Sequence, residues 1–179
     1  GTNVHEVATG IYRINTPVEF PGGAGAFNFN QYLIADDEPL LFHTGPRRMF
    51  PLVSEAIGKI VPLQRLRYLA FSHFEADECG SLNEFLAVAP NAVPVCSRVA
   101  AMHTRTLLCG DLFTQGGTGE TPLTESDILG PSEAFRSPMD YYAHSPDTGA
   151  MLERLAAERP EVLACMHGSA WRGDGAALL

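Results

Sequence analysis

Three short apolar runs in this chain each end in residues that can bind a metal ion. Runs of this kind, bounded by turn residues, predict buried strands. Polar side chains at strand ends are where α/β proteins place their chemistry, so we expect these residues to share one site. The runs and the residues that follow them are 66–71 with His73, Glu75 and Asp77, 106–110 with Asp111, and 162–166 with His167.

The rest of the chain alternates predicted strands and helices. Asp36–Glu38 reads as a hairpin turn between two of the strands. The order of strand, helix and strand predicts a layered α/β domain. We expect further strands at 10–14, 29–34, 39–43 and 92–96, and helices at 50–60, 81–88, 126–142 and 148–158, the last with Met151, Leu152 and Leu155 facing inward.

Composition excludes some classes of function. With 179 residues, 45% hydrophobic residues and a net charge of −9, the chain suits one globular domain. The acidic balance argues against a nucleic-acid or anionic-membrane partner, which would need a basic patch. No apolar run is long enough to span a membrane and the first residues do not form a signal peptide, so we expect a cytoplasmic protein. Four cysteines without CxxC spacing predict reduced core thiols.

The stretch His73–Asp77 is the densest group of candidate ligands. In an extended chain His73, Glu75 and Asp77 would point the same way, because alternate side chains share a side. One imidazole and two carboxylates suit iron or manganese at least as well as zinc. Taken alone, a residue such as Asp111 is more often a turn former, and a single histidine after a strand more often a structural residue. The combination is the specific signal.

This combination resembles the metallo-β-lactamase-fold superfamily. His73-x-Glu75-x-Asp77 is similar to the H-x-E-x-D motif of flavodiiron proteins and stand-alone oxygen-binding di-iron proteins, whereas the hydrolase branch carries H-x-H-x-D-H. Gly45, Gly110-Asp111 and His167-Gly168 match the later landmarks of the family in the right order. The resemblance implies an α/β fold, a four-layer αββα sandwich, as a single domain over residues 1–179, with the metals at one edge of the two sheets.

The resemblance also implies two iron ions, with zinc or manganese as alternatives. His73 and Glu75 would bind the first ion, and Asp77 and His167 the second, with Asp111 bridging both. Replacing a neutral imidazole by Glu75 adds negative charge and a hard oxygen donor, which stabilises higher oxidation states of iron. That change favours a site for dioxygen over a zinc hydrolase.

Three more residues are expected beside these ligands. Glu78 stands where the hydrolases have a metal-binding histidine, and His43 stands where many members have an aspartate. Trp171 follows His167 closely and is expected to cover the site. The alternatives are an exposed or helix-capping Glu78, a structural His43 and a core Trp171.

The chain departs from the family in its middle. Family members carry a further histidine ligand before the bridging aspartate, but residues 96–111 contain only His103. We therefore expect a segment of the family domain to be missing near residues 101–104, and a C-terminal tail to be missing after Leu179. If residues 101–104 are continuous, the alternatives are a five-ligand site or His103 as the substitute ligand.

The function implied is that of a non-haem di-iron protein that binds, senses or reduces dioxygen. Flavodiiron proteins receive electrons through FMN in a flavodoxin domain, for which this chain has no room, so we expect no flavin here and a separate electron donor. The ligand would be dioxygen or another small molecule, and a homodimer stays open. The alternatives are a metal-dependent hydrolase of the same superfamily, acting on a thioester, lactone or phosphodiester, and a metal-poor binding module.

Overall fold

The computed structural model describes residues 1–23, 25–72, 75–96, 105–139, 146 and 148–179. Within them the strands form two sheets, in the orders β1-β2-β3-β4-β5-β6 and β7-β9-β10-β8. The first sheet contains β1 (Asn3–Ala8), β2 (Ile11–Glu19), β3 (Ala26–Ile34), β4 (Leu40–Phe42), β5 (Tyr68–Phe71) and β6 (Val93–Cys96). The second contains β7 (Thr106–Gly110), β8 (Leu123–Thr124), β9 (Val162–Cys165) and β10 (Ala170–Arg172).

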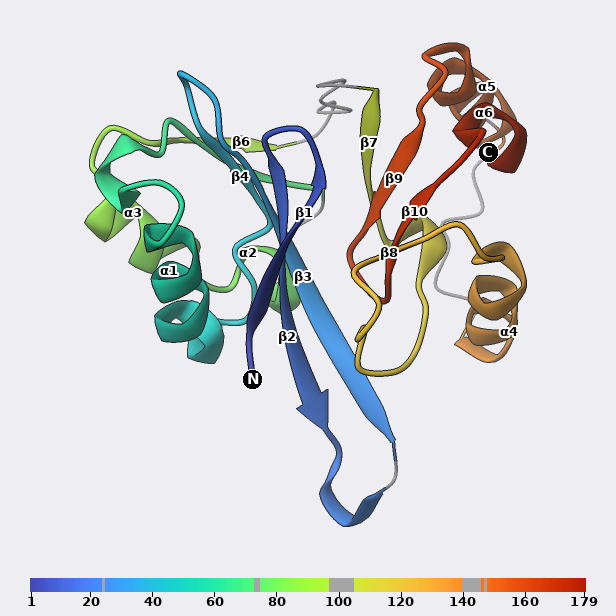
Figure 1. The fold of residues 1–179 in the computed structure, drawn as a ribbon, viewed down its shortest axis with the longest axis horizontal. Helices are drawn as coiled ribbons and strands as arrows, with labels where there is room; N and C mark the ends of the chain where they lie inside the picture. The colour runs from blue at the N-terminus through green and yellow to red at the C-terminus, as the bar shows by residue number, and fades with distance from the viewer. Residues whose placement is uncertain (24, 73–74, 97–104, 140–145, 147) are drawn as a thin grey trace.

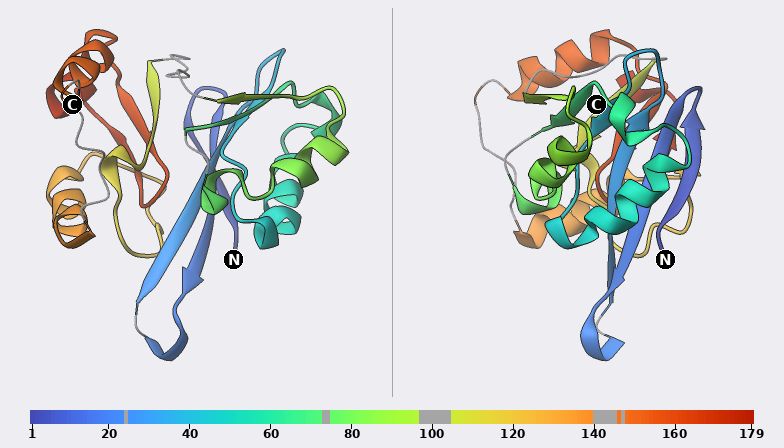
Figure 2. Two further views of the ribbon diagram at one scale, coloured as in Figure 1. Left: turned by 180° about the vertical axis from the view of Figure 1, so that it is seen from behind. Right: turned by 90° about the vertical axis from the view of Figure 1, so that its left-hand side faces the viewer.

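Helices cover the outer faces of the two sheets (Figure 1). On the first sheet lie α1 (Phe50–Gly58) and α3 (Leu82–Val88), and beside the second lie α4 (Leu129–Met139), α5 (Thr148–Ala157) and α6 (Gly175–Leu178). The view from behind shows the same succession of layers (Figure 2). The described part of the chain is therefore an αββα sandwich.

The hydrophobic core has one cluster for each interface between layers. Val53 of α1 and Phe85 of α3 pack against Leu33 and other residues of the first sheet. Between the sheets, Tyr32 and Ala164 belong to a second cluster. A third cluster joins the second sheet to α5 and α6. Strands β5, β7 and β9 are almost wholly buried, which explains why they read as continuous apolar runs.

Three parallel strands carry the residues that the sequence singled out. β5 pairs in parallel with β4 and β6 in the first sheet, and β7 pairs in parallel with β9 in the second. The chain leaves β5 toward Glu75, β7 toward Asp111 and β9 toward His167. Parallel pairing places the carboxyl ends of neighbouring strands at one edge, as expected.

A row of buried polar side chains on β2 and β3 joins the two sheets near His167. The Asn30 side-chain amide donates to the backbone carbonyls of Cys165 (3.1 Å) and Gly168 (2.9 Å). Arg13, which is fully buried, donates to the Gly168 carbonyl at 2.7 Å. Burial is the main factor that lowers the pKa of Arg13. These bonds fix the backbone on both sides of His167.

Most predicted elements are confirmed, and the differences have physical causes. The sequence reading missed β1, β8 and β10 because short strands with exposed or polar positions give little periodicity. The inward position predicted for Met151 is wrong, since its side chain is 47% exposed on α5. Residues 101–104, where a missing segment was expected, lie outside the described residues.

None of the described helices has the length and hydropathy needed to cross a membrane.

Candidate metal centre

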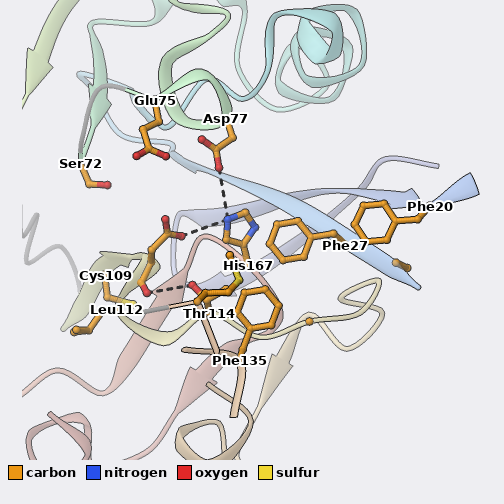
Figure 3. Close-up of a pocket in the computed structure, with 14 residues that line it drawn as sticks. Phe20, Phe27, Ser72, Glu75, Asp77, Cys109, Leu112, Thr114, Phe135 and His167 are labelled. Atoms are coloured by element: carbon orange, nitrogen blue, oxygen red, sulfur yellow. Dashed lines mark hydrogen bonds and ion pairs between the residues drawn. The ribbon is translucent and has the colours of Figure 1, made fainter. Parts of the chain in front are cut away.

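Four of the five predicted ligands line one pocket of about 670 Å³ at the carboxyl ends of the strands. Glu75 and Asp77 reach it from the first-sheet side of the molecule, and Asp111 and His167 reach it from the ends of β7 and β9. Figure 3 shows Glu75 and Asp77 facing His167 across this pocket. The fifth predicted ligand, His73, lies outside the described residues.

Glu75 and Asp77 are placed by the start of a short helix, α2 (Ala76–Cys79). Glu75 is the N-cap residue, in an extended conformation (φ −121°, ψ 161°), while Asp77 lies in the first turn of the helix. The extended chain under which His73, Glu75 and Asp77 would share a side does not continue through Asp77, because the helix begins at Ala76. The two carboxylates nevertheless line the same pocket.

His167 is oriented by its backbone partner on β3. Its Nδ1 atom lies 2.7 Å from the carbonyl oxygen of Asn28, so Nδ1–H donates to that oxygen. The other nitrogen, Nε2, then faces the pocket, 3.3 Å from Asp111 Oδ1 and 3.7 Å from Asp77 Oδ2. This arrangement is typical of metal-binding histidines, whose second nitrogen is fixed by a carbonyl or carboxylate. Phe27 packs on the ring, with centroids 4.1 Å apart.

Asp111 is directed into the pocket by a sharp turn at Gly110. Gly110 has φ +53° and ψ −129°, a conformation that side chains with a Cβ rarely adopt. A Cβ atom at this position would also lie 2.9 Å from Ser72 Oγ. Both the backbone conformation and the space beside Ser72 therefore require a glycine at the end of β7, and this turn sets the direction of Asp111.

Gly110→Ala is expected to lower the free energy of unfolding by roughly 1–3 kcal/mol, from backbone strain and the clash with Ser72. Gly58→Ala is the matched control. Gly58 ends α1 with open space around its Cα, so alanine there is expected to be neutral or to stabilise by up to about 1 kcal/mol. Urea unfolding of both variants measures the difference, and equal effects would show that the Gly110 turn is not strained by a side chain.

The donor set fits a hard metal such as iron. The described residues offer three carboxylates and one imidazole, and carboxylate and imidazole donors suit iron and manganese. Among the described His, Cys, Asp and Glu side chains, no three already surround a common point.

Glu78 and His43 meet in a buried cluster behind the ligands. Both side chains are fully buried, and His43 Nε2 lies 3.3 Å from Glu78 Oε1. The Ser72 hydroxyl donates to the Glu78 carboxylate at 2.8 Å. The exposed alternative for Glu78 is therefore wrong. His43 Nε2 also lies 3.2 Å from the Ser72 hydroxyl oxygen.

Trp171 packs against the cluster between the second sheet and its helices, and it is not among the described residues that line the pocket. Its predicted role as a cover of the site therefore gains no support from its position. His103, the alternative ligand, lies outside the described residues.

Sequence reasoning missed the side chains that hold His167 and wall the pocket. Phe27 and Phe29 contact the His167 ring, while Asn28 between them binds its Nδ1 and, through Oδ1, the amide of Gly168. The alternation of Phe and Asn over residues 27–30 was the sequence signal for these side chains. In a strand, alternate residues point to opposite faces, so the phenylalanines share one face and the asparagines share the other. The apolar wall also includes Phe20, Leu112, Phe135 and Met139.

Comparison with known proteins agrees with this architecture. The family model described as "ODP family beta lactamase" matches residues 27–108. A putative diflavin flavoprotein A 2 of Thermosynechococcus vestitus is 26% identical over 128 residues, which cover 67% of this chain and 22% of that protein. The chain thus spans about a fifth of the length of this curated relative.

Two solved structures show the same fold at low sequence identity. The metal-soaked Flv1 flavodiiron core of Synechocystis has a TM-score of 0.79 and 15% identity, covering 96% of this chain and 57% of that one. Rubredoxin oxygen:oxidoreductase of Desulfovibrio gigas has a TM-score of 0.76 and 15% identity, covering 98% and 59%. The predicted metallo-β-lactamase-like sandwich is confirmed, and so is the resemblance to flavodiiron proteins.

Proposed function

We propose that this chain, which has the metallo-β-lactamase fold and resembles flavodiiron proteins, is a non-haem di-iron protein that binds or reduces dioxygen. One observation carries the proposal. The carboxylates of Glu75, Asp77 and Asp111 line one pocket with the Nε2 atom of His167. A donor set dominated by carboxylates favours iron over zinc and stabilises its higher oxidation states.

Each ligand has a proposed place. His73 and Glu75 would hold the first iron, Asp77 and His167 the second, and Asp111 would bridge them. The contacts of His167 Nε2 with both Asp77 and Asp111 support the second part of this assignment. When bound, the two iron ions supply the electron transfer to dioxygen that amino-acid side chains cannot.

The chain's own residues prepare the pocket for that chemistry. Asn28 holds His167 so that Nε2 keeps its lone pair for an ion. Phe27, Leu112 and Phe135 give the pocket an apolar wall beside the carboxylates. An apolar wall excludes water and strengthens the electrostatic interactions within the site. A small apolar molecule such as dioxygen suits such a pocket.

The proposal also includes the source of electrons and the cellular location of the protein. Similar proteins are named as a diflavin flavoprotein and as a rubredoxin oxygen:oxidoreductase, and the chain covers only part of each. We propose a separate electron donor for this domain, with dioxygen as its ligand and the cytoplasm as its location.

The hydrolase alternative is less compatible with the site. Hydrolases of this superfamily use a metal-binding histidine at the position of Glu78. Here that side chain is buried and engaged by Ser72 and His43. Glu75 likewise replaces a second imidazole, so the chain lacks two of the nitrogen donors that a zinc site would use.

The test is metal analysis of the wild type and of Glu75→His. After anaerobic reconstitution with ferrous iron, we expect two irons per chain in the wild type and a visible absorption change on adding dioxygen. Glu75→His restores an imidazole and is expected to shift the preference toward zinc when both metals compete. Glu120→His, at an exposed loop position, is the control and should behave as wild type. Unchanged iron binding and oxygen reactivity in Glu75→His would contradict the role given to Glu75.

A further inference from the structure

Two cysteines lie side by side next to the proposed ligands. The Sγ atoms of Cys109 and Cys165 are 3.7 Å apart, and the Cys109 thiol donates to the sulfur of Cys165. Cys109 is two residues before Asp111, and Cys165 is two residues before His167. The sequence, which separates the two thiols by more than fifty residues, gave no sign of this pairing.

The pairing of β7 with β9 brings the thiols together. The register passes from Leu108↔Ala164 to Gly110↔Cys165, so Cys109 is an extra residue on β7 opposite Cys165. Bulges of this kind redirect side chains next to functional sites. Neighbouring strands lie about 4.8 Å apart, within the Cα separation of about 4.4–6.8 Å that a disulfide requires. Closing the pair to a bond length of about 2.05 Å needs a small rotation of the two side chains.

One thiol of the pair is accessible from the pocket and the other is not. Cys109 is half-buried and lines the pocket together with Asp111, while Cys165 is fully buried beneath it. A small oxidant in the pocket would therefore meet Cys109 first.

We propose that Cys109 and Cys165 form a reversible dithiol–disulfide pair that is oxidised by hydrogen peroxide entering the pocket. Cys109 sulfur attacks one peroxide oxygen, the O–O bond breaks, and a sulfenic acid and one water are formed. Cys165 sulfur then attacks the Cys109 sulfur, forming the S–S bond and releasing a second water. In sum, two thiols and one peroxide give one disulfide and two waters.

The position of the pair links this chemistry to the metal centre. A disulfide would tie β7 to β9 just before the turns that aim Asp111 and His167, so oxidation would alter how these two side chains meet an ion. Peroxide is also the product of two-electron reduction of dioxygen, and a leaking iron site would deliver it next to Cys109. That last step rests on the proposed function, whereas the disulfide itself does not.

The experiment uses metal-free protein, so that its result is independent of iron binding. The folded protein is treated with excess hydrogen peroxide, the remaining thiols are alkylated under denaturing conditions, and free thiols and peptide masses are measured. We expect two of the four thiols to be lost, and a linked Cys109–Cys165 peptide to appear with a mass two hydrogens below the sum of its two thiol peptides. Dithiothreitol should restore all four thiols.

Cysteine variants identify which two residues form the disulfide bond. Cys109→Ser and Cys165→Ala should each abolish the linked peptide, with circular dichroism confirming that the variants are folded. Cys79→Ser is the matched control, because Cys79 donates to the Glu75 carbonyl and is not paired with another thiol in the described structure. It should form the linked peptide as the wild type does. Sulfinic acid on Cys109 without a link, a link to a different cysteine, or no loss of thiols would overturn the proposal.

A second measurement separates the two proposals. Oxidised and re-reduced samples are reconstituted with ferrous iron and their iron content is compared, with at least a twofold decrease expected after oxidation. If the disulfide forms but the protein binds no iron in either state, the result supports the redox pair and contradicts the proposed di-iron function. If the protein binds two irons but forms no disulfide, the result supports the di-iron function and contradicts the redox pair.

Discussion

Asp111→Asn is expected to remove both iron ions from the protein. Asp111 Oδ1 lies 3.3 Å from His167 Nε2, and its carboxylate is the group that we place between the two ions. Asparagine keeps the size of the side chain but is neutral, and its amide has one oxygen donor where the carboxylate has two. A bridge needs two oxygen donors and the negative charge that offsets repulsion between two cations.

Iron analysis after identical anaerobic reconstitution measures the effect. We expect the content to fall from two irons per chain to fewer than one, and the dioxygen-dependent absorption change to disappear. Asp37→Asn, an exposed residue of the β3–β4 turn, is the matched control and should retain two irons. Full iron content in Asp111→Asn, in a variant that unfolds at the wild-type temperature, would exclude a bridging role for this residue.

Glu78→Ala is expected to lower the free energy of unfolding by about 1–3 kcal/mol, the range for leaving a buried hydrogen-bonding group without its partner. Glu78 is fully buried, accepts hydrogen bonds from Ser72 and lies 3.3 Å from His43 Nε2. The other ring nitrogen of His43 faces the sulfur of Met166 at 2.8 Å. Alanine would leave the histidine buried without its carboxylate, and the lost side-chain volume would leave a cavity.

Urea unfolding compares Glu78→Ala with a surface control. Glu84→Ala removes a carboxylate that pairs with the exposed Arg47, so its effect should stay below about 1 kcal/mol. The double variant His43→Ala/Glu78→Ala should lose less stability than the sum of the single variants, because the two residues interact directly. Additive effects, or a loss below about 1 kcal/mol in Glu78→Ala, would show that the cluster contributes little.

The sequence was sufficient to predict the layered fold and the ends of the strands. Buried parallel strands require apolar runs, and their ends require turn residues, so β5, β7 and β9 were visible as local patterns. The short strands β8 and β10 were not visible, because their pairing depends on partners far away in the chain. The same limit explains Met151, which lies at an apolar position of a helix but faces away from the sheet.

The side chains that support the site were decided only by tertiary contacts. Glu78 follows Asp77 in the sequence, which leaves open whether it is an exposed residue at a helix start or a residue beside the ligands, and α2 turns it inward against His43. Asn28 alternates with Phe27 and Phe29 in the sequence, but only the approach of β3 to the end of β9 makes its carbonyl the partner of His167. Such contacts depend on how the two sheets pack, which local periodicity does not determine.

The sequence by itself determined which residues could serve as ligands, because residue type and position at a strand end are local properties. Tertiary structure decided that Glu75, Asp77, Asp111 and His167 line one pocket, and that His167 presents Nε2 to it. It also decided that Cys109 and Cys165 lie 3.7 Å apart. The physical reason is the same in each case: parallel pairing and packing between sheets join residues that the chain holds far apart.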